Sequence, residues 1–205
     1  MRRNLVIWAA LVALYGTFLF WHAPRHPPLD PTEWRMALTQ ADFGAEALSE
    51  GVAALFDSDD GRPFYMINIL DTRTVAAYPD GQFPDITEGA EAARRYGAGI
   101  IPELLRRGSY PMFLASPQAT LLESISAETA RFEEVGIVRY RSRRDFLDMI
   151  TGAPFQSILV HKWASLEGTI VIPAVPGVAV DLTIAVPLFL LGIGLGLSLR
   201  RRRVE

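Results

Sequence analysis

Two long apolar runs lie near the ends of the 205-residue chain. Residues 5–21 contain no charged side chain, and neither do residues 182–199. Each run approaches the ~20 residues that a helix needs to cross a bilayer, and neither has the polar face of a soluble helix. The pattern predicts two transmembrane helices. The first run could instead be a cleaved signal peptide, but the bulky Phe20 and Trp21 make a poor cleavage site and favour an uncleaved anchor.

Arginines flank these runs asymmetrically. Arg2 and Arg3 precede the first run and "RRRR" (200–203) follows the second, whereas the inner flanks hold few basic residues. The positive-inside rule places both termini in the cytoplasm, so we expect a two-pass protein of a bacterial inner (cell) membrane with a periplasmic, extracytoplasmic domain. The predicted segments are a membrane anchor at 1–21, a proline-rich spacer at 22–31, a folded domain at 32–176, a membrane helix at 177–199 and a basic cytoplasmic tail at 200–205.

Between the runs, the apolar pattern changes repeatedly between the spacings of strands and helices. Thr32 is expected to cap a first helix, and Ser142 with Asp145 resembles a capping box that opens a later one. The predicted elements after the first helix are a strand at 63–73, a helix at 87–107, strands at 107–116 and 131–142, helices at 143–150 and 154–166, and a strand at 168–176. The order β-α-β-β-α-β predicts an α+β domain of the ferredoxin-like type.

The predicted first strand, "PFYMINILDTR" (63–73), is apolar on both faces. Tyr65, Ile67 and Ile69 share one face, and Asn68 is the polar residue of the other. A sheet of this type carries its helices on one face and leaves the other bare. The bare face therefore needs a cover, and we expect a second copy of the same sheet, giving a homodimer with a barrel-like core.

Composition removes several classes of function. The chain has no cysteine, which excludes disulfides and thiolate sites. Residues 22–178 carry 14 basic and 21 acidic side chains, a net charge of −7, which argues against binding nucleic acid. Lys162 is the single lysine beside 19 arginines, a bias that we attribute to genome composition. The sequence contains no zinc motif, phosphate loop, nucleophilic triad or dinucleotide fingerprint, and we expect no metal or cofactor.

The segment from about residue 31 to 173 resembles the domain of unknown function 1330 family, which belongs to the dimeric α/β-barrel superfamily. The matching positions are Asn68-Ile69-Leu70, Tyr96, Pro102, Gly108, Ser142, Phe146-Leu147, Pro154-Phe155-Gln156 and His161-Lys162. Phe155 stands where the family usually has tyrosine, Lys162 stands where it has arginine, and the two membrane helices are additions. The resemblance implies the fold and the dimer, and it brings no established activity.

Five side chains are candidates for lining a pocket: Asn68, Tyr65, Tyr96, Arg139 and Trp163. A buried amide must be hydrogen-bonded, so Asn68 is either a polar anchor in a pocket or a residue bonded to nearby backbone. Arg139 can grip a ligand carboxylate or form a salt bridge between subunits. The tyrosines are amphipathic side chains that also occur in ordinary cores. Trp163 is assigned to the core-facing stripe of the helix at 154–166.

Three further residues are singled out. His161 lies off the core-facing stripe and is a weak candidate for an acid/base or a haem ligand, because some barrels of the superfamily bind haem through histidine, although a solvated or interface histidine fits as well. Gly192 and Gly196 form a GxxxG pattern in the second membrane helix, which favours close helix packing.

Three functions follow from these observations. The first is a binding or assembly module of a larger membrane complex, since the sequence contains no catalytic motif. The second is a cofactor-independent enzyme of the oxygenase or isomerase type acting on a small aromatic or lipophilic compound. The third is a haem-binding barrel that uses His161. A dry core favours the module, whereas a cavity of ~300 Å³ or more beside Asn68 favours the enzyme.

Overall fold

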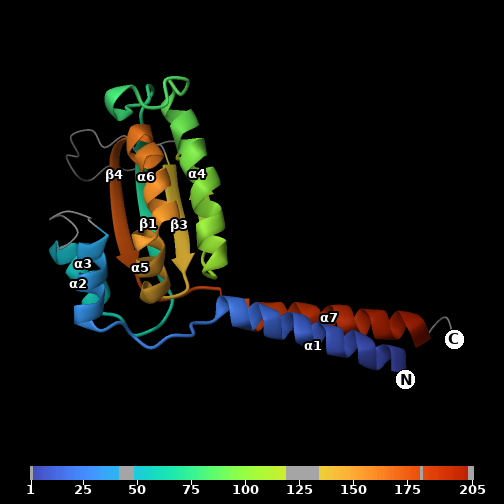
Figure 1. The fold of residues 1–205 in the computed structure, drawn as a ribbon. Coiled ribbons are helices and arrows are strands. Elements are labelled where there is room, and N and C mark those ends of the chain that lie inside the picture. Colours follow the sequence, from blue (N-terminus) through green and yellow to red (C-terminus); the bar gives the residue numbers. More distant parts are fainter. Residues whose placement is uncertain (1, 42–48, 119–133, 181, 203–205) are drawn as a thin grey trace. The chain divides into compact units, whose positions relative to one another are not determined.

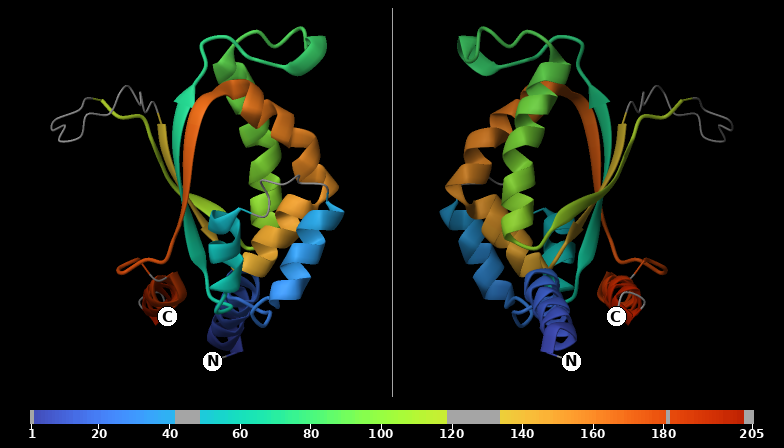
Figure 2. Two further views of the ribbon diagram at one scale, coloured as in Figure 1. Left: turned by 90° about the vertical axis from the view of Figure 1, so that its left-hand side faces the viewer. Right: turned by 90° about the vertical axis from the view of Figure 1, so that its right-hand side faces the viewer.

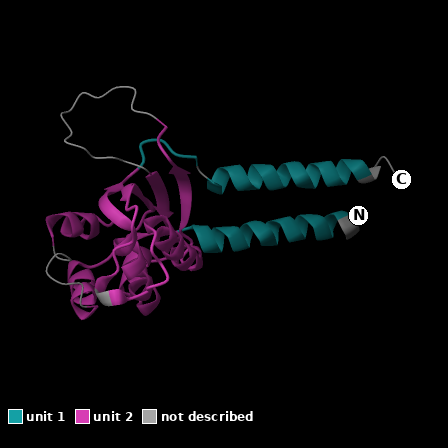
Figure 3. Cartoon of the chain, turned by 90° about the horizontal axis from the view of Figure 1, so that it is seen from above, with its two compact units in different colours: residues 1–23, 176–205 teal, residues 24–175 magenta. Residues whose placement is uncertain are grey.

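The computed structural model describes residues 2–41, 49–118, 134–180 and 182–202. They belong to two compact units, one made of residues 1–23 and 176–205 and the other of residues 24–175 (Figure 3). The unit of residues 24–175 holds the sheet, and the other unit holds the two apolar helices predicted near the ends of the chain.

Four antiparallel strands form one open sheet in the order β2-β3-β1-β4. The strands are β1 (Phe64–Thr72), β2 (Tyr110–Ala115), β3 (Glu134–Tyr140) and β4 (Leu166–Ala174). β1 is central, and its Asn68 is paired with Gly136 on one side and Val171 on the other. The α+β class and the predicted order of strands and helices are therefore confirmed for the described residues.

Helices cover one face of this sheet (Figures 1 and 2). The long helices α4 (Gly89–Arg106) and α6 (Ala153–Ser165) lie side by side across it, and they approach closely where Gly99 faces Ile158. The remaining elements of this unit are α2 (Pro31–Gln40), α3 (Glu50–Asp57), the short η2 (Pro79–Gly81) and α5 (Arg143–Thr151). The helix expected to start at Thr32 begins at Pro31, and its cap is Asp30, whose Oδ1 accepts from the backbone N–H of Thr32 at 2.7 Å.

An aromatic cluster joins the helices to the end of β1. The ring of Trp34 stacks on Phe56 with centroids 5.5 Å apart, and Phe64 stacks on Tyr140 at 5.2 Å. Phe146 meets the edge or face of three of these rings. Large aromatic rings packed this closely contribute strongly to the stability of a core.

The start of α5 confirms the predicted capping box. Ser142 Oγ accepts from the backbone N–H of Asp145 at 3.1 Å and donates to the Asp145 carboxylate at 2.6 Å. The guanidinium of Arg141 also binds this carboxylate, and all three side chains are buried. Burial alone raises the pKa of Asp145, but these hydrogen bonds and the charge of Arg141 outweigh it, so the pKa of Asp145 is lowered.

The other face of the sheet is apolar and has no cover among the described residues. Phe113, Ile170 and Ile172 have between 43% and 52% of their surface exposed. Ile67 of β1 and Ile137 of β3 lie between them and are half-buried. Figure 2 shows that the helices leave this side of the sheet open. The expected bare face is thus present, and its expected cover, a second copy of the sheet, stays a prediction.

The two apolar helices form the second unit. They are α1 (Arg2–His22) and α7 (Leu182–Arg202), each with a 19-residue stretch long and apolar enough to cross a membrane. Only 6% and 11% of these stretches is buried, unlike the core helices of soluble proteins. Tyr15 Oη donates to the carbonyl oxygen of Thr183 at 2.7 Å, which ties the two helices together.

The close packing of α1 on α7 occurs at a glycine that the GxxxG pattern does not contain. A Cβ added to Gly194 would lie 2.4 Å from the ring of Trp8. A Cβ added to Gly192 or Gly196 would meet nothing within 4 Å. Gly192 and Gly196 therefore do not pack on α1, and their proposed role in helix packing stays a prediction that concerns another chain.

Candidate functional site

A cavity of about 610 Å³ lies between the covered face of the sheet and the helices α4 and α6. The floor comes from alternate residues of β1 and β3, and Gly136, opposite Asn68, leaves that floor without a side chain. The volume lies within the ~300–1,000 Å³ range of ligand pockets. Its lining is mainly apolar, and the polar or charged side chains that reach it are Asn68, Thr72, Arg94, Tyr96, Glu134, Tyr140, Lys162 and Ser165.

Asn68 reaches this cavity from the middle of β1. Its Nδ2 donates to the carbonyl oxygen of Met66 on the same strand at 3.2 Å. Its Oδ1 accepts no hydrogen bond from the residues that the structure describes. An amide oxygen that no described residue satisfies is free to accept a hydrogen bond from a ligand or from water in the cavity.

Two phenols lie in the same cavity. Tyr96 comes from α4 and Tyr140 from the end of β3. Burial raises the pKa of Tyr96 to about 12. Burial also raises the pKa of Tyr140, and the neighbouring Tyr96 adds to this effect. Both phenols are neutral at physiological pH, so each can donate a hydrogen bond to a ligand oxygen.

Lys162 reaches the cavity from α6 and, like Tyr140, is not among the pocket residues predicted from the sequence. Its Nζ lies 5.8 Å from the centroid of the Tyr96 ring and 5.5 Å from that of Trp163. Nζ forms no ion pair with any carboxylate in the described parts of the chain. Burial without a counter-charge lowers the pKa of Lys162 below its ordinary value of 10.5.

The prediction that Trp163 faces the core depended on which side of α6 was assumed to face the sheet. Trp163 was placed on the core-facing stripe, but it is 55% exposed and does not line the cavity. A helical step from Phe155 through Ile158 and Leu159 reaches Lys162 just as well, because the spacing of 3.6 residues falls between neighbouring positions. The available signal was a lysine, normally a surface residue, on an otherwise apolar stripe.

Two other predicted pocket residues lie on the opposite face of the sheet. Tyr65 belongs to the face of β1 that carries Ile67 and Ile69, and its partner across β3 is Arg139. The Arg139 side chain is buried, donates to the carbonyl oxygen of Gly108 at 3.3 Å and lies over the ring of Tyr110. Neither Tyr65 nor Arg139 lines the cavity, so of the five candidates only Asn68 and Tyr96 do.

His161 lies outside the cavity, on the neighbouring side of α6. Its Nδ1 shares a hydrogen bond of 2.7 Å with Tyr78 Oη, and its ring lies 4.7 Å from that of Phe83. Burial, together with the charge of Arg95, lowers the pKa of His161. This position gives the haem hypothesis no support, because the histidine does not reach the hollow that would hold the ring. The described residues contain no cluster of three or more metal-ligating side chains.

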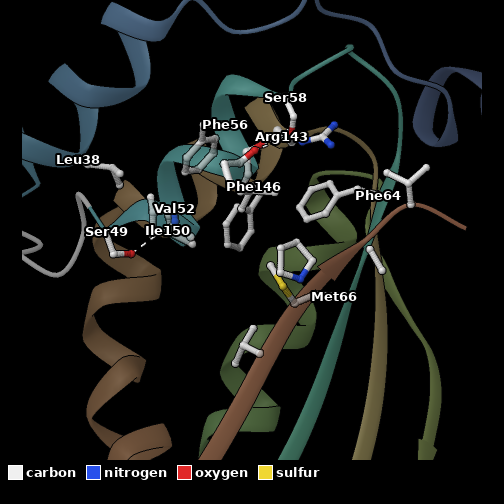
Figure 4. A pocket seen from close by; sticks show the side chains of 17 residues that line it. Leu38, Ser49, Val52, Phe56, Ser58, Phe64, Met66, Arg143, Phe146 and Ile150 are labelled. Carbon is white, nitrogen blue, oxygen red and sulfur yellow. Dashed lines mark hydrogen bonds between the residues drawn. The ribbon is translucent and has the colours of Figure 1, made fainter.

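A second cavity, of about 680 Å³, lies between α3, α5 and the ends of β1 and β4. Figure 4 shows its walls, which include the rings of Phe56, Phe64 and Phe146. The charged group at its edge, Arg143, lies 3.5 Å from Asp59 and 3.3 Å from Asp60, so its charge is already balanced. The first cavity is the better candidate site because three of its polar side chains, Tyr96, Tyr140 and Lys162, have no hydrogen-bond or ion-pair partner among the described residues.

The solved structures that resemble this chain include two crystal structures of RPA0582. The crystal structure of methylated RPA0582 protein has 27% sequence identity and a TM-score of 0.57, and the match covers 65% of this chain and 95% of that chain. A crystal structure of RPA0582, a protein of unknown function from Rhodopseudomonas palustris, has 25% sequence identity and a TM-score of 0.53, and the match covers 75% of this chain and 100% of that chain. No protein-family model matches the chain, and no curated protein matches it significantly.

The cavity can therefore hold a molecule that is mostly apolar and carries one oxygen-bearing end. The neutral phenols are donors, the Asn68 amide supplies an acceptor, and Lys162 supplies either an ammonium or a free amine. These groups come from β1, β3, α4 and α6, which are far apart in the sequence, and only the folded domain brings them together.

Proposed function

We propose that this protein is a membrane-anchored domain that binds, and acts without a cofactor on, a small apolar compound with an oxygen-bearing end. The observation that supports this is the cavity of about 610 Å³ beside Asn68, whose amide oxygen, two phenols and lysine have no hydrogen-bond or ion-pair partner in the described chain. A structural core of this kind would be filled, since an unfilled cavity costs stability.

The fold that we propose is the ferredoxin-like one, in a member of the domain of unknown function 1330 family. The antiparallel order β2-β3-β1-β4, with α4 between β1 and β2 and α5 and α6 between β3 and β4, supports it. The similarity to RPA0582, itself of unknown function, is a likeness of overall structure and brings no activity.

The proposed location is a bacterial inner membrane, crossed twice, with the domain in the periplasm. Two helices with apolar stretches of 19 residues support the two crossings, and the arginines at both ends of the chain support cytoplasmic termini. A membrane anchor keeps the proposed binding domain near the bilayer, where lipophilic compounds collect.

The bare apolar face of the sheet favours a second activity, association through that face. We propose that it joins two copies into a homodimer, because each copy presents the same row of isoleucines and a two-fold interface is self-complementary. Docking onto a larger membrane complex, as an assembly module, is the alternative use of this face.

Native mass spectrometry of the full-length protein, extracted gently from its own membrane, tests the proposed function. We expect a dimer that carries a small molecule. In Ala93→Leu, where a cavity-lining alanine of α4 becomes larger, the small molecule should be lost. The matched control is Ala98→Leu on the exposed side of the same helix, which should keep it. A wild-type dimer without any small molecule would contradict the proposal. So would a small molecule that stays bound to the Ala93→Leu variant.

A further inference from the structure

Lys162 is the exception in a chain that otherwise uses arginine for its positive charges. Nineteen of the 20 basic residues are arginine. Arginine stays protonated at any physiological pH, whereas an ammonium on a lysine can lose its proton and become a nucleophile. The one position that carries a lysine is also the one basic position of α6, and its side chain lines the cavity.

Burial in the cavity lowers the pKa of Lys162, so its free amine is more accessible than that of an exposed lysine. The titratable or charged groups that line the same cavity are Arg94 and Tyr96 on α4 and Glu134 and Tyr140 on β3. Glu134 makes no ion pair with Nζ, and the phenols are neutral. The remaining lining is mainly apolar, so the ammonium is held without a counter-ion where its desolvation is costly.

We propose that Lys162 is an amine nucleophile that captures an apolar aldehyde or ketone in this cavity as an imine. This inference rests on the proposed function, because it names the class of compound that the cavity takes and the atom that reacts with it. Lysines desolvated in apolar pockets are activated in this way.

The step balances without a cofactor. The ammonium of Lys162 first gives one proton to solvent, and the lone pair of Nζ then attacks the carbonyl carbon. The C–N bond forms as the π electrons move to the oxygen, and one proton then passes from the nitrogen to that oxygen to give a neutral carbinolamine. Loss of the hydroxyl group with a proton, as water, forms the C=N bond of the imine. No electron enters or leaves, so neither an oxidant nor a reductant is needed.

Other residues of the cavity suit a carbonyl compound. A neutral phenol, such as that of Tyr96 beside Nζ, can donate a hydrogen bond to the carbonyl oxygen and stabilise the charge that develops there. The apolar walls, which include Ile100, Leu104 and Phe155, fit an alkyl or aromatic body. The same walls limit the water that hydrolyses an imine.

Reductive trapping tests this inference in the full-length protein in detergent. Hexanal is the probe, and sodium cyanoborohydride reduces any imine to a stable hexylamine that peptide mass spectrometry locates. The internal reference is the lysine introduced by Arg62→Lys, on a side chain that is 82% exposed. We expect Lys162 to be alkylated several-fold faster than this reference in the same molecule, and the Ala93→Leu change to remove that advantage.

The outcomes separate the two proposals. Alkylation of Lys162 no faster than the reference lysine overturns the inference, and the proposed function then stands if native mass spectrometry still finds a molecule that Ala93→Leu displaces. Fast alkylation that persists in Ala93→Leu also overturns it, because the amine then reacts outside the cavity. A protein with neither a bound molecule nor a fast lysine overturns both proposals together.

Discussion

Replacing Asn68 by leucine separates the two roles that this amide can have. If Asn68 serves the fold, the substitution removes a needed hydrogen bond. If it serves a ligand, the protein carries the amide at a cost to its stability, and leucine relieves that cost while removing the contact. Leucine is close to asparagine in size, so neither a large hole nor a large overlap is introduced.

The structure gives the size of the expected effect. The substitution loses one bond, from Nδ2 to the Met66 carbonyl at 3.2 Å, worth about 1 kcal/mol. It also removes an amide oxygen that no described residue satisfies, which costs about 1–3 kcal/mol when fully buried and less here, because Asn68 is half-buried. The apolar leucine adds about 1 kcal/mol of burial against α4 and α6. We therefore expect the free energy of unfolding to rise by about 1 kcal/mol.

Thermal unfolding of the full-length chain in detergent, followed by circular dichroism, measures this change. For a protein of this length, 1 kcal/mol corresponds to an increase in Tm of about 2–4 °C. Native mass spectrometry of the same variant should show that the bound molecule is lost. Ile67→Leu, on the other face of the same strand, is the control and should keep it. A lower Tm together with a retained molecule would show that Asn68 is a structural residue and refute the reasoning.

Three further predictions concern other parts of the molecule. Asp145→Asn should lower the free energy of unfolding by about 3 kcal/mol, because it leaves the buried Arg141 without its carboxylate. The folded pKa of Asp145 is lowered, so its ionised form stabilises the protein above the unfolded pKa near 3.8, and this stabilisation is lost as the pH falls below that value. Measurements of unfolding against pH should show this loss in the wild type and not in the variant. Gly194→Leu should lower the Tm, because the new side chain overlaps Trp8 between α1 and α7. Ile172→Glu should convert the dimer to a monomer in light scattering, because it places a charge on the bare face of the sheet.

Each of these predictions has a matched control. Asp148→Asn changes an exposed carboxylate of the same helix and should cost much less than Asp145→Asn. Gly192→Leu adds a side chain where nothing lies within 4 Å, so a Tm as low as that of Gly194→Leu would contradict the packing seen in this unit. Val75→Glu places the same charge on an exposed loop residue and should leave the dimer intact. A dimer that survives Ile172→Glu would show that the sheet face is not the interface.

Local patterns of the sequence were sufficient to predict most of the helices and strands. The apolar run in residues 63–73 predicted β1, and the Ser142–Asp145 pair predicted the start of α5, because both depend on neighbours within a few positions. Thr32 shows the limit even here, since Asp30 two residues earlier is an equally good cap and is the one used. The apolar runs at both ends likewise became helices of membrane-spanning length.

The sequence by itself determined which stretches are strands, helices and apolar spans, because backbone periodicity and local hydrogen bonding decide these. Only the tertiary structure decided which side of each element meets which partner. Periodicity could not choose between Trp163 and Lys162 on α6, or between Gly192 and Gly194 on α7, because that choice is made by contacts with β1, α4 and α1, far away in the chain. The cavity lies between elements that are distant in the sequence, so only the tertiary structure shows that Lys162 lines it.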